Sequence, residues 1–452
     1  MNTSFFQELL GGIAERGRAL IDLSIGGHNH TDSIEELSRA LMSSRGEASG
    51  VALARRILNA YGRLSAEDRL AFFHFLNDAF TPDSERVRAA AARYLEAPDE
   101  DTLRELTNSV EPPMQEFLRR LNMAPGATAE IVAMRTDLLE FLKDDPDLKS
   151  VDANFVHLLN SWFNRGFLVL QRIDWSTPAN ILEKIIQYEA VHQIKDWSDL
   201  RRRLDPRDRR CYAFFHPSLI DEPLIFVQIA LTAEIPDSIQ DLLSEESKMN
   251  GDHEPSTAVF YSISNCQKGL SGISFGNFLI KQVVADLEKE MPSLRNFVTL
   301  SPIPGFRRWL ERARQGHELD YLSEQQRAAL DIADNDHWWR DEDKAETLRP
   351  VLLAACAHYL LLAKSASGMP ADPVARFHLG NGARLERINW LGDVSEKGMR
   401  ESCGLMVNYQ YVLKDIERNH EMLVNQGAIA ASKAARGHLL TSESSTALAT
   451  TG

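Results

Sequence analysis

The sequence predicts two domains, an all-helical bundle followed by a domain of mixed α and β structure. The chain has 452 residues, which is more than one compact domain usually contains. Apolar residues recur at helical spacing up to about residue 168, and runs rich in β-branched and aromatic residues begin soon afterwards. We therefore expect a helical bundle at residues 1–168, an α/β domain at 169–440, and a flexible tail at 441–452, where Ser, Thr, Ala and Gly predominate.

The N-terminal part divides into segments of helix length. One segment begins with Ser65 and Asp68, a pattern typical of a capped helix start, and continues with apolar residues on one face. Helices of this kind pack as a bundle, which can serve as a scaffold or as an oligomer interface. Three breaks containing proline separate the segments, at 81–83, 111–113 and 124–126.

The C-terminal part alternates strand and helix signals. The connection at 218–223 is short, so we expect the strands on either side of it to be antiparallel neighbours. Helices are expected after Thr177-Pro178, at 275–291 and at 343–367. The expected strands are 210–215, 224–231, 258–264, 297–300 and 385–390.

Composition and charge exclude some classes of partner. The hydrophobic fraction of 44% and the charged fraction of 25% are those of an ordinary globular protein. A formal net charge of -15 opposes binding to nucleic acid, which needs exposed Lys and Arg in excess, so we expect no nucleic-acid partner. Six arginines between Arg201 and Arg210 are interpreted as a solvated face, with attraction of a phosphate-bearing ligand as the alternative.

Cysteine usage and the apolar runs predict a cytoplasmic protein without a membrane partner. The four cysteines lie far apart, so we expect reduced, buried thiols and no metal site. The N-terminus opens with Ser4 and Gln7 in capping-box spacing, which is unlike a signal peptide. The longest apolar run, at 351–363, is too short to span a bilayer.

A glycine-containing segment between a strand and a helix is the strongest functional signal. Gly269, Gly272 and Gly276 follow the strand at 258–264 and precede the helix. Glycines let a backbone approach a ligand closely, and the N–H groups at a helix N-terminus bind phosphate. The segment resembles the coenzyme A loop of acetyltransferases, which Gln267, Gly269 and Gly272 approximate without matching its spacing. A tight structural turn is the alternative interpretation.

Blocks of sequence on both sides of this loop together resemble malonyl-CoA decarboxylases. The resemblance runs from about Trp175 to Leu413, and the helical N-terminal region agrees with the same family. So many ordered blocks are not expected by chance. They are 182–186, 190–192, 260–264, 269–270, 278–281, 300–306, 373–375, 377–379, 381–383, 387–390 and 402–406.

The resemblance implies a C-terminal domain of acetyltransferase-like (GNAT) fold that converts malonyl-CoA to acetyl-CoA and carbon dioxide without metal or added cofactor. Loss of carbon dioxide from a malonyl thioester leaves an enolate whose charge lies largely on the thioester oxygen. The substrate is therefore its own electron sink. The enzyme has to orient the leaving carboxylate, place hydrogen-bond donors at the enolate oxygen and deliver a proton to carbon.

The resemblance places the catalytic serine of the family at Ser301 and its catalytic histidine at His378. In the usual family assignment the serine accepts a proton and the histidine donates one, and the two can form a hydrogen-bonded dyad. Without the resemblance, Ser301 before a proline would be interpreted as a turn residue. His378 between Phe and Leu would be interpreted as a packed core residue.

The resemblance also implies residues that bind the substrate or support the site. Some family members have Glu where this chain has Ser274, and a hydroxyl can donate or accept but carries no charge. For Ser262 and Tyr411, a buried strand hydroxyl and a packed aromatic ring are the alternatives. The implied substrate loop is Ser271, Gly272, Ile273, Ser274, Phe275, Gly276 and Asn277. The possible supporting residues are Ser262, Gln267, Gly269 and Tyr411.

Two other functions remain open at the level of sequence, because fold does not fix function. One is an acyltransferase that passes an acyl group from coenzyme A to an amine, and the other is a catalytically silent scaffold or coenzyme A sensor. The resemblance further suggests a homotetramer built as a dimer of dimers, in bacterial cytosol. Use of malonate and control of the malonyl-CoA level are both compatible with such an enzyme.

Overall fold

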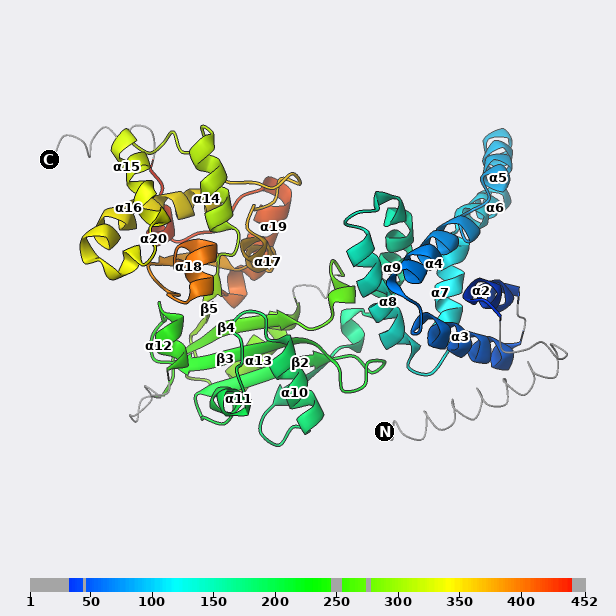
Figure 1. Ribbon diagram of the computed structural model, residues 1–452, viewed down its shortest axis with the longest axis horizontal. Helices are drawn as coiled ribbons and strands as arrows, with labels where there is room; N and C mark the ends of the chain where they lie inside the picture. Colours follow the sequence, from blue (N-terminus) through cyan, green and yellow to red (C-terminus); the bar gives the residue numbers. More distant parts are fainter. Residues whose placement is uncertain (1–31, 44–45, 245–253, 274–277, 441–452) are drawn as a thin grey trace. The chain divides into compact units, whose positions relative to one another are not determined.

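The computed structural model describes residues 32–43, 46–244, 254–273 and 278–440. The expected capping box at Ser4, the tail from residue 441 and Ser274–Asn277 of the expected substrate loop lie outside the described residues. The chain forms two compact units (Figure 1). Met1–Val169, Phe215–Glu222 and Gln267–Phe275 belong to the first unit, and the rest of the chain belongs to the second.

The first unit is helical, as the sequence predicts. Ser65 caps α4 by accepting a hydrogen bond from the Asp68 N–H group, and Asp83 and Asp99 cap α5 and α6 in the same way. Pro113 occupies the first turn of α7, where its missing N–H group costs nothing. The helices are α2 (Ile34–Ser43), α3 (Glu47–Tyr61), α4 (Ala66–Ala79), α5 (Ser84–Glu96), α6 (Glu100–Val110), α7 (Pro113–Leu121), α8 (Ala127–Phe141) and α9 (Lys149–Trp162).

The second unit is built around one mixed sheet, which together with the helical first unit confirms the predicted fold class. The order of its strands is β1-β2-β3-β4-β5-β8-β6, and β7 also pairs with β8. The sequence did not predict β1, β6 or β8. The strands are β1 (Val169–Ile173), β2 (Arg209–Phe215), β3 (Pro223–Thr232), β4 (Thr257–Asn265), β5 (Asn296–Thr299), β6 (Ser301–Pro302), β7 (Arg384–Asn389) and β8 (Met406–Gln410).

The three helices expected in the second unit are present as α10, α13 and α16, with one correction. The other helices of this unit were not predicted. The helix expected at 343–367 ends at Leu361, because a turn at 365–368 follows and its Gly368 has a positive φ of 78°. In the part of the chain that the structure describes, no helix combines the length and apolar character needed to cross a membrane. The helices are α10 (Ala179–Tyr188), α11 (Trp197–Leu204), α12 (Ile239–Leu243), α13 (Phe278–Glu290), α14 (Phe306–Gln315), α15 (Glu324–Ala329), α16 (Glu342–Leu361), α17 (Pro373–Gly380), α18 (Glu396–Ser402), α19 (Ile416–Gln426) and α20 (Lys433–Arg436).

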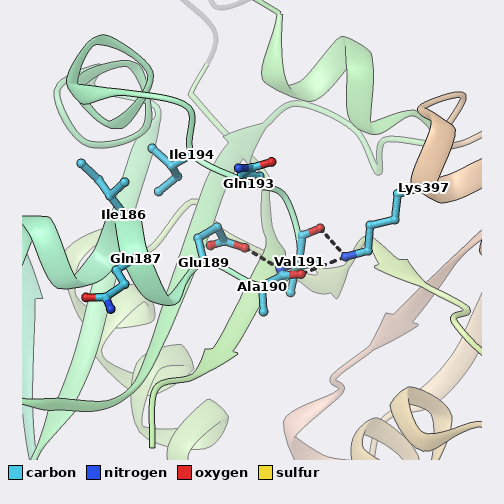
Figure 2. A pocket seen from close by; sticks show the side chains of 8 residues that line it. All are labelled: Ile186, Gln187, Glu189, Ala190, Val191, Gln193, Ile194 and Lys397. Atoms are coloured by element: carbon cyan, nitrogen blue, oxygen red, sulfur yellow. Dashed lines mark hydrogen bonds between the residues drawn. The ribbon is translucent and has the colours of Figure 1, made fainter.

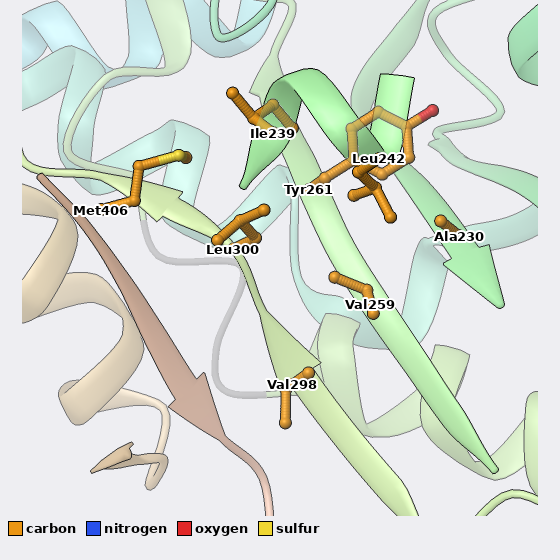
Figure 3. Close-up of a cluster of buried hydrophobic side chains, with 8 residues drawn as sticks. All are labelled: Ala230, Ile239, Leu242, Val259, Tyr261, Val298, Leu300 and Met406. Atoms are coloured by element: carbon orange, nitrogen blue, oxygen red, sulfur yellow. The ribbon is translucent and has the colours of Figure 1, made fainter. Parts of the chain in front are cut away.

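One face of the sheet packs on an apolar cluster (Figure 3). Val298 and Leu300 contribute to it from β5 and from the residue after it, and α12 covers it. Successive side chains of a strand point to opposite faces, so Thr299 and Ser301 project from the other face of the sheet. The cluster consists of Ala230, Ile239, Leu242, Val259, Tyr261, Val298, Leu300 and Met406.

The parallel pair β4 and β5 separates before β4 ends. The pairing runs from Thr257↔Asn296 to Phe260↔Thr299, and the Leu300 N–H group still donates to the Phe260 carbonyl at 3.0 Å. Beyond this point β5 gives way to β6, which pairs with β8 instead. Ser301 therefore lies at the point where neighbouring strands diverge.

The basic stretch expected to be a solvated face is used within the second unit. Arg203 is 5% exposed, pairs with Asp199 at 3.2 Å and donates to the His192 carbonyl at 2.7 Å. Arg209 is also buried and donates to the Leu242 carbonyl at 2.7 Å. The interpretation as a solvated face is wrong for these two arginines, because their guanidinium groups hold backbone carbonyls and carboxylates in the interior.

Candidate active site

The structure brings Ser301 and His378 together. Ser301 Oγ lies 3.2 Å from His378 Nε2, although the two residues are 77 positions apart in the chain. Ser301 is 5% exposed and His378 is 3% exposed. Both side chains are therefore largely removed from water. In the protein interior, hydrogen bonds and charges have larger effects than at the surface.

Ser301 is held by the turn that joins β5 to α14. Its backbone pairs with β8 opposite Val407. The turn ends at Gly305, where an added Cβ atom would lie 2.3 Å from the Tyr359 hydroxyl and 3.6 Å from Asp372 Oδ2. Only glycine fits this contact, so the Leu-Ser-Pro-Ile-Pro-Gly-Phe block has a structural reason for its glycine.

His378 is held by α17, whose first turn is capped by Asp372. The carboxylate of Asp372 accepts hydrogen bonds from the N–H groups of Val374 and Ala375 at 2.9 and 2.8 Å. The Tyr359 hydroxyl lies 3.5 Å from the same carboxylate. Asp372 is 1% exposed, and this burial raises its pKa from the ordinary 3.8 to about 6.

The second ring nitrogen of His378 faces a tyrosine. Nδ1 lies 2.8 Å from the hydroxyl of Tyr411, and the imidazole stacks on the ring of Tyr409 with centroids 4.8 Å apart. Burial lowers the pKa of His378 to about 3 and raises the pKa of Tyr411 well above its usual range. Both groups are therefore neutral at neutral pH. The structure thus places Tyr411, a residue proposed from the sequence, directly against His378.

Thr299 is the fourth member of this group, and the sequence reasoning missed it. Ser301 Oγ donates to Thr299 Oγ1 at 2.8 Å, and the backbone N–H of Tyr409 donates to the same oxygen at 3.1 Å. Thr299 is fully buried. A signal was present in the sequence, because a polar side chain two positions before Ser301 on a strand projects from the same face.

Ser262 belongs to a different hydrogen-bond network, centred on Glu189. Its hydroxyl lies 2.7 Å from Glu189 Oε2, and Gln228 Nε2 donates to that oxygen at 2.9 Å. The other carboxylate oxygen accepts the N–H groups of Val191 and His192, both at 2.9 Å. The Ser262 hydroxyl has one proton and donates it to the Glu189 carboxylate, so it cannot donate to a second group. Glu189 was not among the residues predicted from the sequence.

Glu189 also lines a cavity of about 470 Å³. Figure 2 shows its side chain turned back onto its own loop, while Lys397 reaches the carbonyls of Ala190 and Val191. The Lys397 Nζ distances to these carbonyl oxygens are 2.8 and 3.2 Å. The charged groups of this cavity are thus used to hold the loop at 189–194.

The described part of the expected substrate loop belongs to the first unit. Ser271 and Gly272 are exposed and Ile273 is buried. Gly272 has a positive φ of 78°, which favours glycine.

Gln267 and Gly269 lie at the start of this loop. Gln267 Nε2 lies 3.4 Å from Glu222 Oε2. Gly269 packs against α8 so closely that an added Cβ atom would lie 1.9 Å from the Val132 carbonyl oxygen. The glycines at 269 and 272 therefore have structural reasons.

Arg135 of α8 fixes this loop. Like Thr299, Arg135 was not predicted from the sequence. Its Nη1 atom donates to the carbonyls of Gly269 and Ser271 at 2.7 and 2.8 Å, and its Nε atom pairs with Asp152 at 2.7 Å. Arg135 is 2% exposed. The C=O and N–H groups of one trans peptide point in opposite directions, so the N–H of Gly272 is directed away from Arg135.

Comparison with known protein families identifies the family of this chain. The malonyl-CoA decarboxylase C-terminal domain matches residues 166–449, and the malonyl-CoA decarboxylase N-terminal domain matches residues 80–163. The chain belongs to the malonyl-CoA decarboxylase family. The resemblance found in the sequence is thereby confirmed.

Individual malonyl-CoA decarboxylases agree with this assignment. The mitochondrial enzyme of the goose Anser anser anser is 37% identical over 78% of this chain and 76% of its own length. The mitochondrial enzyme of Rattus norvegicus is 39% identical over 70% and 69%. The crystal structure of the Rhodopseudomonas palustris malonyl-CoA decarboxylase is 54% identical, with a TM-score of 0.86 over 89% of this chain and 98% of that chain. The Agrobacterium vitis structure is 52% identical, also with a TM-score of 0.86.

Proposed function

We propose that this chain converts malonyl-CoA to acetyl-CoA and carbon dioxide, with Ser301 and His378 as the reacting groups. The observation that carries the proposal is the buried contact of 3.2 Å between Ser301 Oγ and His378 Nε2 in a member of the malonyl-CoA decarboxylase family. These two residues are the ones that the sequence blocks around them predict. Their roles in the reaction are our proposal.

The chemistry requires hydrogen-bond donors and one proton at the thioester. Cleavage of the bond to the carboxylate releases carbon dioxide and leaves its electron pair in the thioester enolate. The enolate carbon then takes up one proton to give acetyl-CoA. A donor placed in advance where the negative charge develops lowers the barrier, and its effect is largest away from water. The neutral, buried groups at Ser301 and His378 meet this requirement.

The electrostatics of His378 favour proton donation over nucleophilic catalysis. In a Ser-His-Asp triad, a carboxylate at the second ring nitrogen stabilises the imidazolium that forms when His takes the serine proton. Here a neutral tyrosine hydroxyl occupies that position. We therefore assign the proton taken up by the enolate to the N–H group of neutral His378. The imidazolate that this leaves takes up one proton from the solvent, so each turnover consumes one solvent proton.

We propose that the loop at Ser271–Asn277, including Ser274, binds the coenzyme A part of the substrate. Support comes from the exposure of Ser271 and Gly272 and from the helix α13, whose N-terminus follows the loop. Gln267 and Gly269 support the loop from its start. Arg135 holds the carbonyls of Gly269 and Ser271, and the N–H groups of Ser271 and Ile273 donate to Lys268 and Leu270. The Gly272 N–H, directed away from Arg135, is the donor that we propose for a phosphate oxygen.

The test is turnover of malonyl-CoA by the pure protein without any acyl acceptor. We expect acetyl-CoA and carbon dioxide in equal amounts, and a loss of about 10²- to 10⁴-fold in kcat for Ser301→Ala or His378→Asn. Because the two residues act as a unit, the double variant should lose little more than either single one. Ser109→Ala, at a buried serine of α6 in the first unit, is the matched control.

Two outcomes of this test point to the rival functions. Turnover that appears only after an amine is added would identify an acyltransferase. A catalytically silent coenzyme A sensor would bind malonyl-CoA without converting it, and the substitutions at Ser301 and His378 would leave its properties unchanged.

We propose that the protein is a homotetramer, built as a dimer of dimers through the first unit. The helices α5 and α6 support this, because Leu95, Leu103 and Val110 on them are 80%, 47% and 45% exposed. Light scattering should give four times the monomer mass of 50.9 kDa. A monomer at micromolar concentration would contradict the proposal.

We propose that the protein works in bacterial cytosol. Cys211, Cys266, Cys356 and Cys403 are all free and buried, which suits a reducing compartment. The two similar crystal structures described above are of bacterial proteins, which supports a bacterial source. Fractionation of the source cells is the direct test.

A further inference from the structure

The hydrogen bonds at Ser301 form a chain of four side chains, and this chain has a direction. Tyr411, His378, Ser301 and Thr299 follow one another at 2.8, 3.2 and 2.8 Å. Each hydroxyl has one proton, and a neutral imidazole has one N–H group. If one contact is assigned its donor, the donors of the others follow. The protons run either from Tyr411 towards Thr299 or from Thr299 towards Tyr411.

The geometry at Thr299 assigns the first contact. The Tyr409 N–H group can only donate, so Thr299 Oγ1 acts as an acceptor there. The heavy-atom angles at the 2.8 Å contact fit Ser301 Oγ as the donor and Thr299 Oγ1 as the acceptor. Ser301 donates its only hydroxyl proton to Thr299, so Ser301 Oγ can only accept a hydrogen bond from His378. His378 Nε2 must therefore carry the ring proton, and Nδ1 must accept the proton of Tyr411.

We infer that Thr299 is a positioning residue that orients Ser301 and thereby fixes His378 as the Nε2–H tautomer. The inference rests on the proposed function and deepens it. With this direction of the chain, His378 is a donor towards the reacting end and does not withdraw the proton of Ser301. Ser301 is not activated as a nucleophile, which suits decarboxylation and opposes an acyl-enzyme mechanism.

The backbone makes Thr299 suited to this task. Thr299 is the last residue of β5 to pair with β4, and its carbonyl accepts Asn408 Nδ2 at 2.8 Å. The apolar cluster on the other face of the sheet holds Val298 and Leu300, the neighbours of Thr299 in the chain. A β-branched side chain on a strand is stiff at χ1, so the Thr299 hydroxyl has little freedom to turn away.

The test is the ring nitrogen spectrum of His378 in protein labelled with ¹⁵N-histidine, without substrate. The chain has 13 histidines, so His378→Asn assigns the signal. We expect a protonated Nε2 and an unprotonated Nδ1 in the native protein and in Thr299→Ser. Thr299→Val removes the acceptor while keeping the shape, so Ser301 should donate to Nε2 and the proton should move to Nδ1.

Activity gives the second readout. Thr299→Val should lower kcat about 100-fold or more, because a reversed His tautomer is costly in serine proteases, while KM for malonyl-CoA changes less than about threefold. Thr299→Ser should restore most of kcat. The control is Thr257→Val, because Thr257 is equally buried and lies on β4 at the other end of the same parallel pair.

The role of Thr299 and the decarboxylase activity can be tested separately. A native His378 with its proton on Nδ1 would overturn the role of Thr299, whether or not the protein decarboxylates malonyl-CoA. Full kcat in Thr299→Val would overturn it as well. Absence of malonyl-CoA turnover in the native protein, together with the expected tautomer, would instead reject the proposed function.

Discussion

At the scale of single residues, burial determines the chemistry of the site more than charge does. His378 and Tyr411 are both kept neutral by removal from water. In the proposed reaction the substrate carries a carboxylate and develops an enolate, so neutral groups at His378 and Tyr411 would avoid repulsion by a neighbouring anion. The neutral His378 also means that its own protonation does not limit activity near neutral pH.

Asp372 is the residue whose titration should be visible. Its pKa is about 6 in the folded protein, compared with an ordinary value of 3.8. A raised pKa means that the folded state binds more protons than the unfolded state between these values. The resulting stability is present below about pH 4 and is lost as pH rises to about 6. A difference of this size corresponds to roughly 3 kcal/mol.

Asp372→Asn should remove this dependence, because Asn keeps an acceptor at the cap of α17 but does not titrate. Relative to the variant, the native protein should lose roughly 3 kcal/mol of unfolding free energy from about pH 3 to about pH 7, with most of the loss between pH 4 and pH 6. Denaturant unfolding at a series of pH values measures this. Asp83→Asn, at the exposed cap of α5, controls for the change of capping group. Parallel curves for native protein and Asp372→Asn would show that Asp372 is ionised throughout.

At the scale of elements, the loop at 267–273 depends on α8. Arg135 holds two loop carbonyls from 134 and 136 residues away in the chain. Hydrogen bonds from a charged group contribute about 1.5–3 kcal/mol each, so Arg135 is well placed to fix the conformation of the loop.

Arg135→Lys should weaken substrate binding more than chemistry. A lysine has no planar guanidinium, so it cannot hold both carbonyls and Asp152 with the same geometry. We expect KM for malonyl-CoA to rise about tenfold or more, while kcat falls less than about threefold, because Ser301 and His378 are untouched. Steady-state kinetics separates the two.

The control for Arg135 is Arg69→Lys in the same unit. Arg69 pairs with Asp137 of α8 at 3.0 Å and makes no described contact with the loop. It should change stability without changing KM. Equal effects of the two substitutions on KM would show that Arg135 acts only through the stability of the bundle.

The three strands that were not predicted from the sequence each have a weak strand signal, for a different reason. β6 has two residues, and β8 (Met406–Gln410) contains Asn408 and Gln410, which weaken a strand pattern. β1 is an edge strand with little burial. The strands predicted correctly, such as β3 and β4, are buried and rich in β-branched and aromatic residues.

At the scale of the whole molecule, the sequence predicted the order of the two parts and drew attention to Ser301 and His378, which the structure brings into contact. It did not predict the other contacts between distant segments. Ser301 and His378 follow from the family resemblance, whereas Thr299, Arg135 and Glu189 act through partners far along the chain or on neighbouring strands. Such partners are set by strand register and helix packing, which a single sequence does not display. Ser301 at β6, His378 in α17 and Tyr411 after β8 are thus brought together by segments that are far apart in the chain.

A crystal structure with acetyl-CoA bound tests the central claim most directly. We expect the thioester carbonyl oxygen or the adjacent methyl carbon within about 3–3.5 Å of Ser301 Oγ or His378 Nε2, which is the distance that reaction requires. A thioester that lies away from both side chains, with the coenzyme fully ordered, would contradict the assignment of Ser301 and His378 as the reacting groups.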